Sequence, residues 1–268
     1  MAPTCTIVVP CYNEAARLEV ASFRNFSAAH PDYRLLFVND GSTDATMEVL
    51  RRLAVGSAGR IELLDLPRNG GKAEAVRQGM LHAFKTGVPY VGFLDADLAT
   101  PLSAMVQLCE ILERRPECQA VIGCRLPLLG RSIQRRYLRQ VLGNVFCFAA
   151  SRVLGLKIRD TQCGAKLFRV TSESVRAFAT PFVSRWIFDV EVIARLLGLW
   201  REGKQIDPTA AIFEHVLEEW REVKGSRLKA TDFVRAFGEL VAIGWRRGAC
   251  DPLEPVGAVS MPSPRTAA

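Results

Sequence analysis

Short apolar runs alternate with segments of helical spacing through the first 125 residues, and this alternation constrains the fold more than any other feature. Parallel strands need crossover connections long enough to hold a helix, and such crossovers are right-handed. The alternation therefore predicts an α/β fold with a mostly parallel, Rossmann-like sheet flanked by helices. We expect strands at residues 5–9, 34–38, 61–64, 90–94 and 120–122, and helices at 14–30, 45–54, 72–84 and 103–113.

Two aspartates, Asp95 and Asp97, directly follow the apolar run at 88–94. Side chains two residues apart in an extended chain point to the same side, so both carboxylates can reach one hard cation. A hard divalent cation is expected there, bridging a diphosphate. A single acidic pair is weak support, because loops after buried strands are commonly acidic for turn reasons alone.

Earlier strands also end in polar groups, which strengthens the prediction. Asp40 follows the run at 35–38, and residues 10–14 follow the first strand. Ligands bind outside the carboxyl ends of parallel strands, so these groups should meet at one sheet edge, where Asp40 is a candidate to hold a base or a ribose hydroxyl. Residues 68–72, with two glycines and Lys72 opening a helix, are either a phosphate-binding turn or an ordinary glycine turn.

Composition limits the partners and the compartment. The 268-residue chain has a formal charge of +7, which favours anionic partners, but its basic residues form no recognisable nucleic-acid module, so we expect no nucleic acid. Eight scattered cysteines without a Cys-x-x-Cys pair or a secretory pattern predict reduced, buried thiols and a cytoplasmic location. No run approaches the roughly 20 apolar residues that span a bilayer, so we expect only peripheral contact with the cytosolic face of a membrane.

The second half of the chain contains two amphipathic segments. Residues 131–154 should form one long helix, with arginines in its first turns, that either joins the core or lies at a membrane interface. A second helix is expected at 231–250, where packing on the core is favoured. We therefore expect a domain at 1–230, this C-terminal helix, and a disordered tail at 251–268.

The strand-end motifs resemble those of a known family. Segments 8–14 (VVPCYNE), 39–44 (NDGSTD) and 95–97 (DAD) are similar to the nucleotide-sugar and metal motifs of family 2 glycosyltransferases with the GT-A fold. Further segments, similar to the dolichyl-phosphate β-glucosyltransferase branch, lie at 68–80, 123–125, 160–168, 185–191 and 220–227. The resemblance covers about residues 5–230. It implies inverting transfer of a hexose, with glucose from UDP-glucose preferred, to a polyisoprenyl phosphate such as dolichyl or undecaprenyl phosphate.

The resemblance also assigns roles to individual residues. It implies nucleotide-sugar contacts at Pro10, Tyr12, Glu14, Asp40, Lys72 and Asp95, and metal ligation by Asp95 and Asp97. The implied acceptor-phosphate residues are Arg125, Arg131, Ser226 and Arg227, and the implied catalytic residues are Asp97, Arg125 and Asp189, the last near the transferred sugar. The chain departs from the family at Asn39, at Ala73-Glu74 and at Arg227, and in lacking the membrane-spanning segment of many relatives.

Several alternatives remain open from the residues alone. A phosphate monoester is already anionic at pH 7 and needs no base, whereas a soluble hydroxyl acceptor would need one, with Asp189 or His215 as candidates. GDP-mannose is an alternative donor, a non-catalytic nucleotide-sugar-binding scaffold is an alternative function, and a membrane protein is a possible partner. Three of these residues have structural roles as the alternative to contact with a ligand. Asp44 would cap a helix, Arg125 would form an ion pair, and His215 would lie on the surface.

Overall fold

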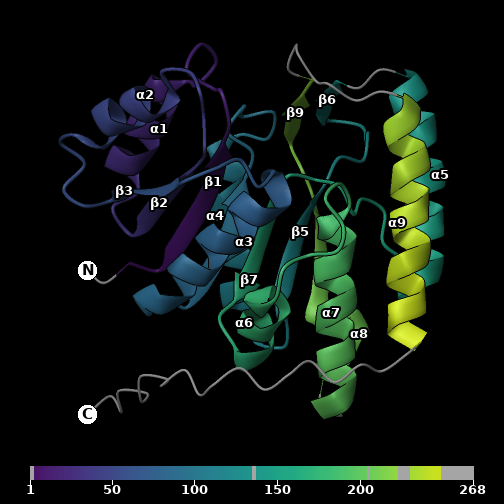
Figure 1. Ribbon diagram of the computed structural model, residues 1–268. Helices are drawn as coiled ribbons and strands as arrows, with labels where there is room; N and C mark the ends of the chain where they lie inside the picture. The colour runs from purple at the N-terminus through teal and green to yellow at the C-terminus, as the bar shows by residue number, and fades with distance from the viewer. Residues whose placement is uncertain (1–2, 135–136, 204–205, 223–229, 249–268) are drawn as a thin grey trace, which may run out of the picture.

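The computed structural model describes residues 3–134, 137–203, 206–222 and 230–248 (Figure 1). The strands are β1 (Cys5–Cys11), β2 (Tyr33–Asp40), β3 (Ile61–Leu66), β4 (Tyr90–Leu94), β5 (Ala120–Cys124), β6 (Ser132–Gln134), β7 (Ala165–Arg169), β8 (Ile212–Val216) and β9 (Glu219–Arg221). The helices are α1 (Val20–Ala29), α2 (Thr46–Ala54), α3 (Lys72–Ala83), the 3₁₀ turn η1 (Phe84–Thr86), α4 (Leu102–Arg114), α5 (Tyr137–Leu154), α6 (Ser172–Ala179), α7 (Phe188–Gly203), α8 (Pro208–Ala211) and α9 (Ala230–Gly248).

The central sheet has seven strands in the order β3-β2-β1-β4-β7-β5-β8. Pairing is parallel between β1 and β2, β1 and β4, β2 and β3, and β5 and β8, whereas β7 runs antiparallel to both β4 and β5. The prediction of a mostly parallel sheet flanked by helices is confirmed. A separate parallel pair, β6 and β9, lies outside this sheet.

Alternation along the strands builds one core on each face of the sheet. On one face Val8 and Leu36 belong to a cluster with α3, α6, α7 and the inner sides of α5 and α9. On the other face Ile7 and Leu35 pack with α1, α2 and α4. Because successive strand residues point to opposite faces, each strand serves both cores, and the carboxyl ends of the parallel strands are left for function.

The first predicted helix, 14–30, is wrong at its start. The chain makes turns after β1, with Asn13 in the left-handed region at φ 54°, and the helix begins only at Val20. The amide of Glu14 donates to the Thr46 hydroxyl (2.8 Å), so this segment is tied to the start of α2 rather than to a helix of its own. Asp44 accepts the amide of Thr46 (2.9 Å), the first residue of α2, but it lies one residue before the N-cap position, which Ala45 occupies.

The predicted long helix at 131–154 is also wrong at its start, because residues 132–134 form β6, paired with β9, and the helix begins at Tyr137. The C-terminal helix is present as α9, which packs against α5 and α7 (Figure 1). The tail at 251–268 lies outside the described residues. Within the described part of the chain, no helix has the length and apolar character needed to cross a bilayer. The seven cysteines described are free and buried, as predicted.

Candidate active site

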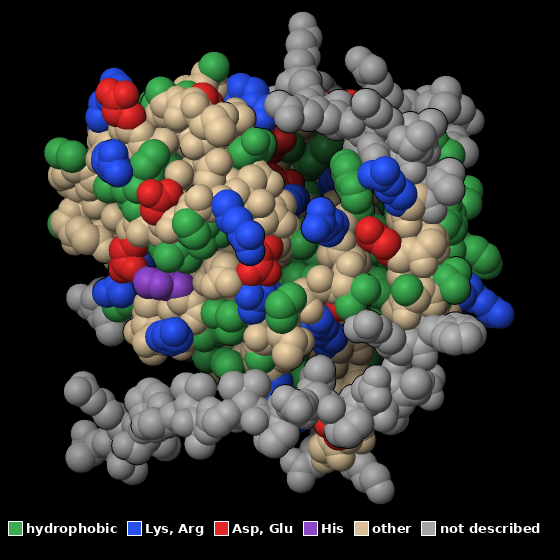
Figure 2. All heavy atoms as spheres, viewed as in Figure 1, with side chains coloured by type: hydrophobic (Ala, Val, Ile, Leu, Met, Phe, Trp, Pro, Cys, Tyr) green, Lys and Arg blue, Asp and Glu red, His purple; other side chains and the backbone are tan. Residues whose placement is uncertain are grey.

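A cavity of about 580 Å³ opens where the carboxyl edge of the sheet faces helices α5, α7 and α9. Much of its polar lining comes from the sheet edge and neighbouring loops: Lys72, Asp95, Asp97, Arg125, Arg159 and Asp160. Arg185 and Asp189 line it from the loop before α7 and from the first turn of that helix. Its apolar lining is contributed largely by the helical side and includes Phe146, Cys147, Trp186, Ile187, Phe188 and Ala236. Figure 2 shows a recess near the top of this view in which acidic side chains lie beside hydrophobic ones. The cavity therefore combines a charged wall with an apolar wall.

Asp95 and Asp97 lie together at this edge, as their spacing predicts. The Lys72 ammonium lies 2.5 Å from Oδ1 of Asp95, and both side chains are partly exposed in the cavity. Burial first, and then the neighbouring charge of Asp95, raise the pKa of Asp97 above its usual value. Burial acts to lower the pKa of Lys72, but the charges of Asp95 and Asp189 outweigh it, so the pKa of Lys72 is raised and the ammonium stays charged.

Gly164, at the entry to β7, makes room for this acidic pair. A Cβ atom at position 164 would lie 2.1 Å from Oδ2 of Asp95, a distance that no side chain tolerates. A glycine here lets the β7 backbone approach the carboxylate. The only signal in the sequence is its place within the segment 160–168, and the residue was not predicted to belong to the site.

Glu14 lies close enough to the acidic pair to interact with it. Burial raises its pKa above the usual value, the nearby Arg17 opposes this, and the charge of Asp97 adds to the rise. One carboxylate oxygen of Glu14 is 2.5 Å from Arg17, while the other, Oε2, is buried without a hydrogen-bond partner. The neighbouring Pro10 is the penultimate residue of β1, and Tyr12 is 38% exposed just beyond the strand. Pro10, Tyr12 and Glu14 are not among the residues that line the cavity, and their contact with a nucleotide sugar stays a prediction.

Asp40 is buried, and both of its oxygens are used by the backbone of the glycine loop. They accept the amides of Gly70 (2.7 Å) and Gly71 (2.9 Å), directly before Lys72 and the start of α3. Gly41, at φ +59°, allows the two segments to approach, since a Cβ there would lie 2.5 Å from the backbone of Arg68. The observed role of Asp40 is to hold the loop that presents Lys72, and its contact with a nucleoside stays a prediction.

Arg125 lines the cavity but forms a buried ion pair. Its Nε and Nη2 atoms donate to the two oxygens of Asp160 at 2.6 and 2.8 Å, and its guanidinium lies over the ring of Trp220 at 5.4 Å. Burial acts to lower the pKa of Arg125, and the charge of Asp160 reverses this and raises it. The structural reading of Arg125 therefore matches the observed contacts, and contact with an acceptor phosphate stays a prediction.

Asp189, in the first turn of α7, is buried and paired with Lys166 of β7. The Lys166 ammonium, itself fully buried, lies 2.5 Å from Oδ1 of Asp189 and also donates to the carbonyl of Cys163. A helix-borne carboxylate among apolar neighbours needs a partner, and the sequence offered a substrate hydroxyl or an arginine such as Arg185, whereas the structure supplies Lys166. Lys166 was missed, although an apolar strand with one lysine next to a buried helical carboxylate is the pattern that a buried pair requires.

The remaining predicted site residues lie elsewhere. Arg131 pairs with Glu218 (3.1 Å) and does not line the cavity, and His215 contacts Gln107 (3.1 Å) on α4. Ser226 and Arg227 lie outside the described residues. Two exposed arginines, Arg159 and Arg185, line the cavity, and the sequence analysis assigned neither of them to an acceptor phosphate.

The acidic pair fits a divalent cation that takes its other ligands from elsewhere. No cluster of three or more His, Cys, Asp or Glu side chains able to hold a metal occurs in the described ranges. Mg²⁺, however, commonly binds through one or two carboxylates together with substrate phosphates and water. The ammonium of Lys72 on Asp95 shows that this carboxylate already stabilises a positive charge. Burial, and then the charge of Asp95, raise the pKa of Asp97, and a bound cation would offset both.

Comparison with known proteins establishes the family. The model of glycosyl transferase family 2 matches residues 6–175. The chain belongs to glycosyl transferase family 2. Two similar relatives are dolichyl-phosphate β-glucosyltransferases: that of Drosophila melanogaster is 34% identical, covering 83% of this chain and 68% of the relative, and that of Trichomonas vaginalis is 32% identical, covering 89% and 70%. The human enzyme of this name is 32% identical, covering 83% and 69%.

Solved structures support the same fold for this family 2 member. Mannosyl-3-phosphoglycerate synthase from Rubrobacter xylanophilus superposes with a TM-score of 0.64 at 15% identity, covering 96% of this chain and 79% of that one. Glucosyl-3-phosphoglycerate synthase from Mycobacterium tuberculosis, in complex with Mn²⁺ and UDP-glucose, superposes with a TM-score of 0.61 at 20% identity, covering 96% and 82%. At these identities the likeness shows the GT-A fold alone. The family and fold together make the chain a glycosyltransferase.

Proposed function

We propose that this glycosyltransferase transfers glucose from UDP-glucose to a polyisoprenyl phosphate, such as dolichyl phosphate, at a membrane surface. The observation that carries the proposal is the composition of the cavity, in which Lys72, Asp95 and Asp97 face an apolar wall built by α5, α7 and α9. The charged wall suits a nucleotide diphosphate with its cation, and the apolar wall suits the hydrocarbon chain of a lipid phosphate. The names of the relatives support the same donor and acceptor classes.

The sheet edge would bind the donor. Pro10, Tyr12 and Glu14 would lie beside the nucleoside at the end of β1, while the loop held by Asp40 places Lys72 to offset charge on the diphosphate. Asp95 and Asp97 would hold Mg²⁺ or Mn²⁺, which when bound supplies Lewis-acid stabilisation of the departing nucleotide.

The acceptor phosphate would enter from the side of the helices. Its oxygen is already anionic, so it can attack the anomeric carbon without a base, and attack from the face opposite the nucleotide inverts the configuration. Asp189 is paired with buried Lys166. This pairing favours a role in orienting the sugar over a role as the base that accepts a proton. We propose that the exposed Arg159 and Arg185 attract the phosphate, with Arg125 holding this part of the wall through Asp160.

An outer apolar ridge supports peripheral membrane contact. We use this name for the exposed hydrophobic side chains of two neighbouring helices: Leu142, Val145 and Phe148 of α5 with Phe237 and Val241 of α9 (Figure 1). Phe148 is 72% and Val241 64% exposed, a large cost in water that burial among lipid chains would remove. The exposed Arg152 near the end of α5 and Lys157 beyond it suit anionic head groups.

The test is a transfer assay with purified protein, Mn²⁺ or Mg²⁺, UDP-glucose and dolichyl phosphate in phosphatidylcholine vesicles. We expect a glucosylated lipid that is absent when the metal is chelated, with GDP-mannose giving less product. A product from GDP-mannose alone would establish the mannosyl alternative. Transfer to a soluble hydroxyl acceptor without transfer to the lipid, or no transfer from any donor, would overturn the proposal.

A further inference from the structure

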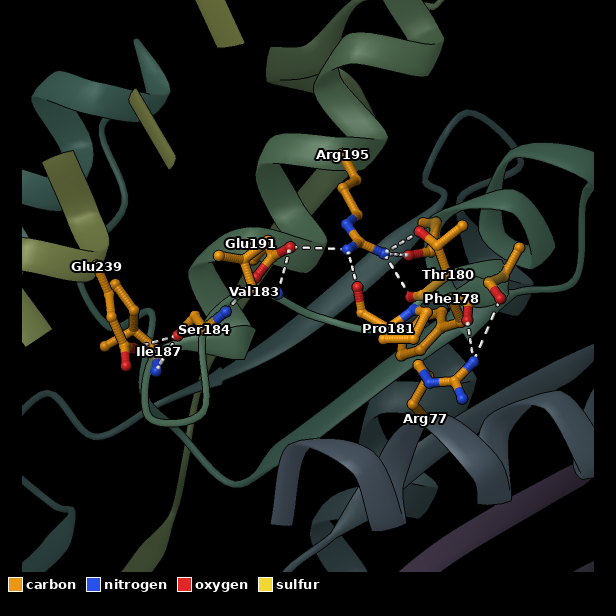
Figure 3. Close-up of polar contacts among 12 residues, drawn as sticks. Arg77, Phe178, Thr180, Pro181, Val183, Ser184, Ile187, Glu191, Arg195 and Glu239 are labelled. Atoms are coloured by element: carbon orange, nitrogen blue, oxygen red, sulfur yellow. Dashed lines mark hydrogen bonds and ion pairs between the residues drawn. The ribbon is translucent and has the colours of Figure 1, made fainter. Parts of the chain in front are cut away.

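The loop at residues 180–187 leads into α7 and forms part of the apolar wall of the cavity. Side chains of α7 make several of the hydrogen bonds that fix this loop (Figure 3). The carboxylate of Glu191 accepts the backbone amides of Val183 (3.2 Å) and Ser184 (2.9 Å). Arg195, one turn further along α7, donates to the same carboxylate at 2.7 Å. Two backbone amides of this turn are therefore satisfied by a carboxylate of the helix that follows it.

Two arginines fix the chain that precedes this turn. Arg195 donates to the carbonyls of Thr180 (2.9 Å) and Pro181 (2.8 Å), and Arg77 of α3 donates to the carbonyl of Ala179 (3.2 Å). Figure 3 shows these contacts on the side of the loop away from α9. That side is thus held by the body of the domain.

Among the described residues, the hydrogen bonds on the other side of the loop come from the carboxylate of Glu239. Glu239 of α9 accepts a hydrogen bond from the hydroxyl of Ser184 and lies 3.3 Å from the backbone amide of Trp186. The Ser184 hydroxyl oxygen in turn accepts the amide of Ile187 at 2.8 Å, directly before α7 begins. The series Glu239, Ser184, Ile187 therefore connects the C-terminal helix to two residues, Trp186 and Ile187, that line the cavity.

The same helix also reaches the cavity and the outer apolar ridge. Ala236 of α9 lines the cavity, and Phe237 and Val241 lie on the exposed side of the helix. Glu239 lies between these positions along the chain. Any displacement of α9 relative to α7 would therefore be transmitted to the cavity wall through this carboxylate.

We infer that Glu239 is a positioning residue for the acceptor, which holds the loop at 180–187 in the conformation that receives the polyisoprenyl phosphate. The inference rests on the proposed function. Without the carboxylate, the buried Ser184 hydroxyl and the Trp186 amide lose their acceptor, and the loop populates other conformations. Only molecules with the competent loop then bind the acceptor, so the apparent affinity for the acceptor falls in proportion to their fraction. Donor binding at the opposite wall is unaffected.

The test compares Glu239→Ala with Glu239→Gln and a control, Glu202→Ala, in the transfer assay with UDP-glucose and dolichyl phosphate vesicles. We expect Glu239→Ala to raise the KM for dolichyl phosphate about tenfold, the size of one lost charge-assisted hydrogen bond, with the KM for UDP-glucose unchanged. Glu239→Gln keeps an acceptor oxygen and should recover most of the affinity. Glu202, which pairs with Arg176 on the surface, should have no effect.

Two further measurements separate positioning from general damage. Ser184→Ala should raise the acceptor KM similarly, and the double variant should be no worse than either single variant, because both changes break one series of contacts. Hydrogen exchange of the amides at 183–188 should accelerate in Glu239→Ala even without substrate. An unchanged acceptor KM, equal losses for donor and acceptor, or unchanged exchange would overturn the inference. If the wild-type protein glucosylates no polyisoprenyl phosphate, the proposed function itself fails, and the exchange result still reports on the loop.

Discussion

The two walls of the cavity are built in different ways. On the sheet-edge wall, Asp95, Asp97 and Lys72 lie just beyond the end of β4 or at the start of α3, so their positions follow from local chain geometry. On the helical wall, Phe146, Ile187 and Ala236 come from segments far apart in the sequence and meet only because α5, α7 and α9 pack together. Substitutions at the sheet edge should therefore change chemistry at constant stability, whereas those in the helical wall should change access of the acceptor.

The largest expected effect is an exception to this division between the two walls. Arg125 lies beside the sheet edge, yet its contacts are structural. Arg125→Ala removes the guanidinium that offsets the buried charge of Asp160, which should lower the free energy of unfolding by about 3–5 kcal/mol. Chemical denaturation measures the change. Arg185→Ala, at an exposed cation of the same cavity, should change stability by no more than about 0.5 kcal/mol.

A double variant separates this structural role from contact with the acceptor. Arg125→Met with Asp160→Asn removes both charges and keeps a side-chain oxygen for the amide of Gln162. It should recover much of the stability. Full transfer activity in this folded variant would show that Arg125 does not bind the acceptor phosphate.

The next effect is on turnover. Asp97→Asn should lower transfer by about 100- to 1,000-fold, the size seen when one group that stabilises developing charge is removed. The melting temperature should not fall, because the raised pKa of Asp97 shows that its charge is a cost to the folded state, and asparagine keeps an oxygen for the amide of Ala99. Asp207→Asn, at an exposed helix cap, is the control and should behave as wild type. A large loss of stability in Asp97→Asn would contradict the division between the two walls.

A smaller effect tests the helical side. Phe148→Ser should weaken binding to phosphatidylcholine vesicles containing anionic lipid by about tenfold, since burial of one such side chain is worth roughly 1.5–3 kcal/mol. Flotation or sedimentation of vesicles measures the binding. Val55→Ser provides a matched control, because Val55 is 76% exposed beyond α2, away from α5 (Figure 1). Equal losses in both variants would show that the ridge is not the membrane contact.

The smallest effect concerns pH. Only the ionised carboxylate of Asp97 binds a cation, and its raised pKa means that it takes up a proton at a higher pH than an ordinary aspartate. Affinity for Mn²⁺ should therefore decline on acidification while most exposed carboxylates are still ionised. Paramagnetic resonance of free Mn²⁺ across a pH series would show this. A decline confined to the range of an unperturbed aspartate would indicate that burial and Asp95 do not act on the site.

The sheet edge was predictable because ligands bind outside the carboxyl ends of parallel strands. Strands β1, β2 and β4 each contain a continuous apolar run and are each followed by a helix, so their parallel direction and the place of the acidic pair follow from the sequence. The prediction failed for the helix expected at 14–30, because the amide of Glu14 bonds to Thr46 in another element, a contact that local propensity does not report.

What the sequence by itself determined is the sheet core, its carboxyl edge and the acidic chemistry at that edge, because these depend on residues close together in the chain. Only the tertiary structure decided the partners of the charged groups: Asp160 for Arg125, Lys166 for Asp189 and the glycine loop for Asp40. It also decided the antiparallel β7 and the helical wall. The physical reason is that a buried charge needs a partner nearby in space, and the packed chain supplies one from a distant part of the sequence. Separation along the sequence does not predict which residues lie close together in the fold.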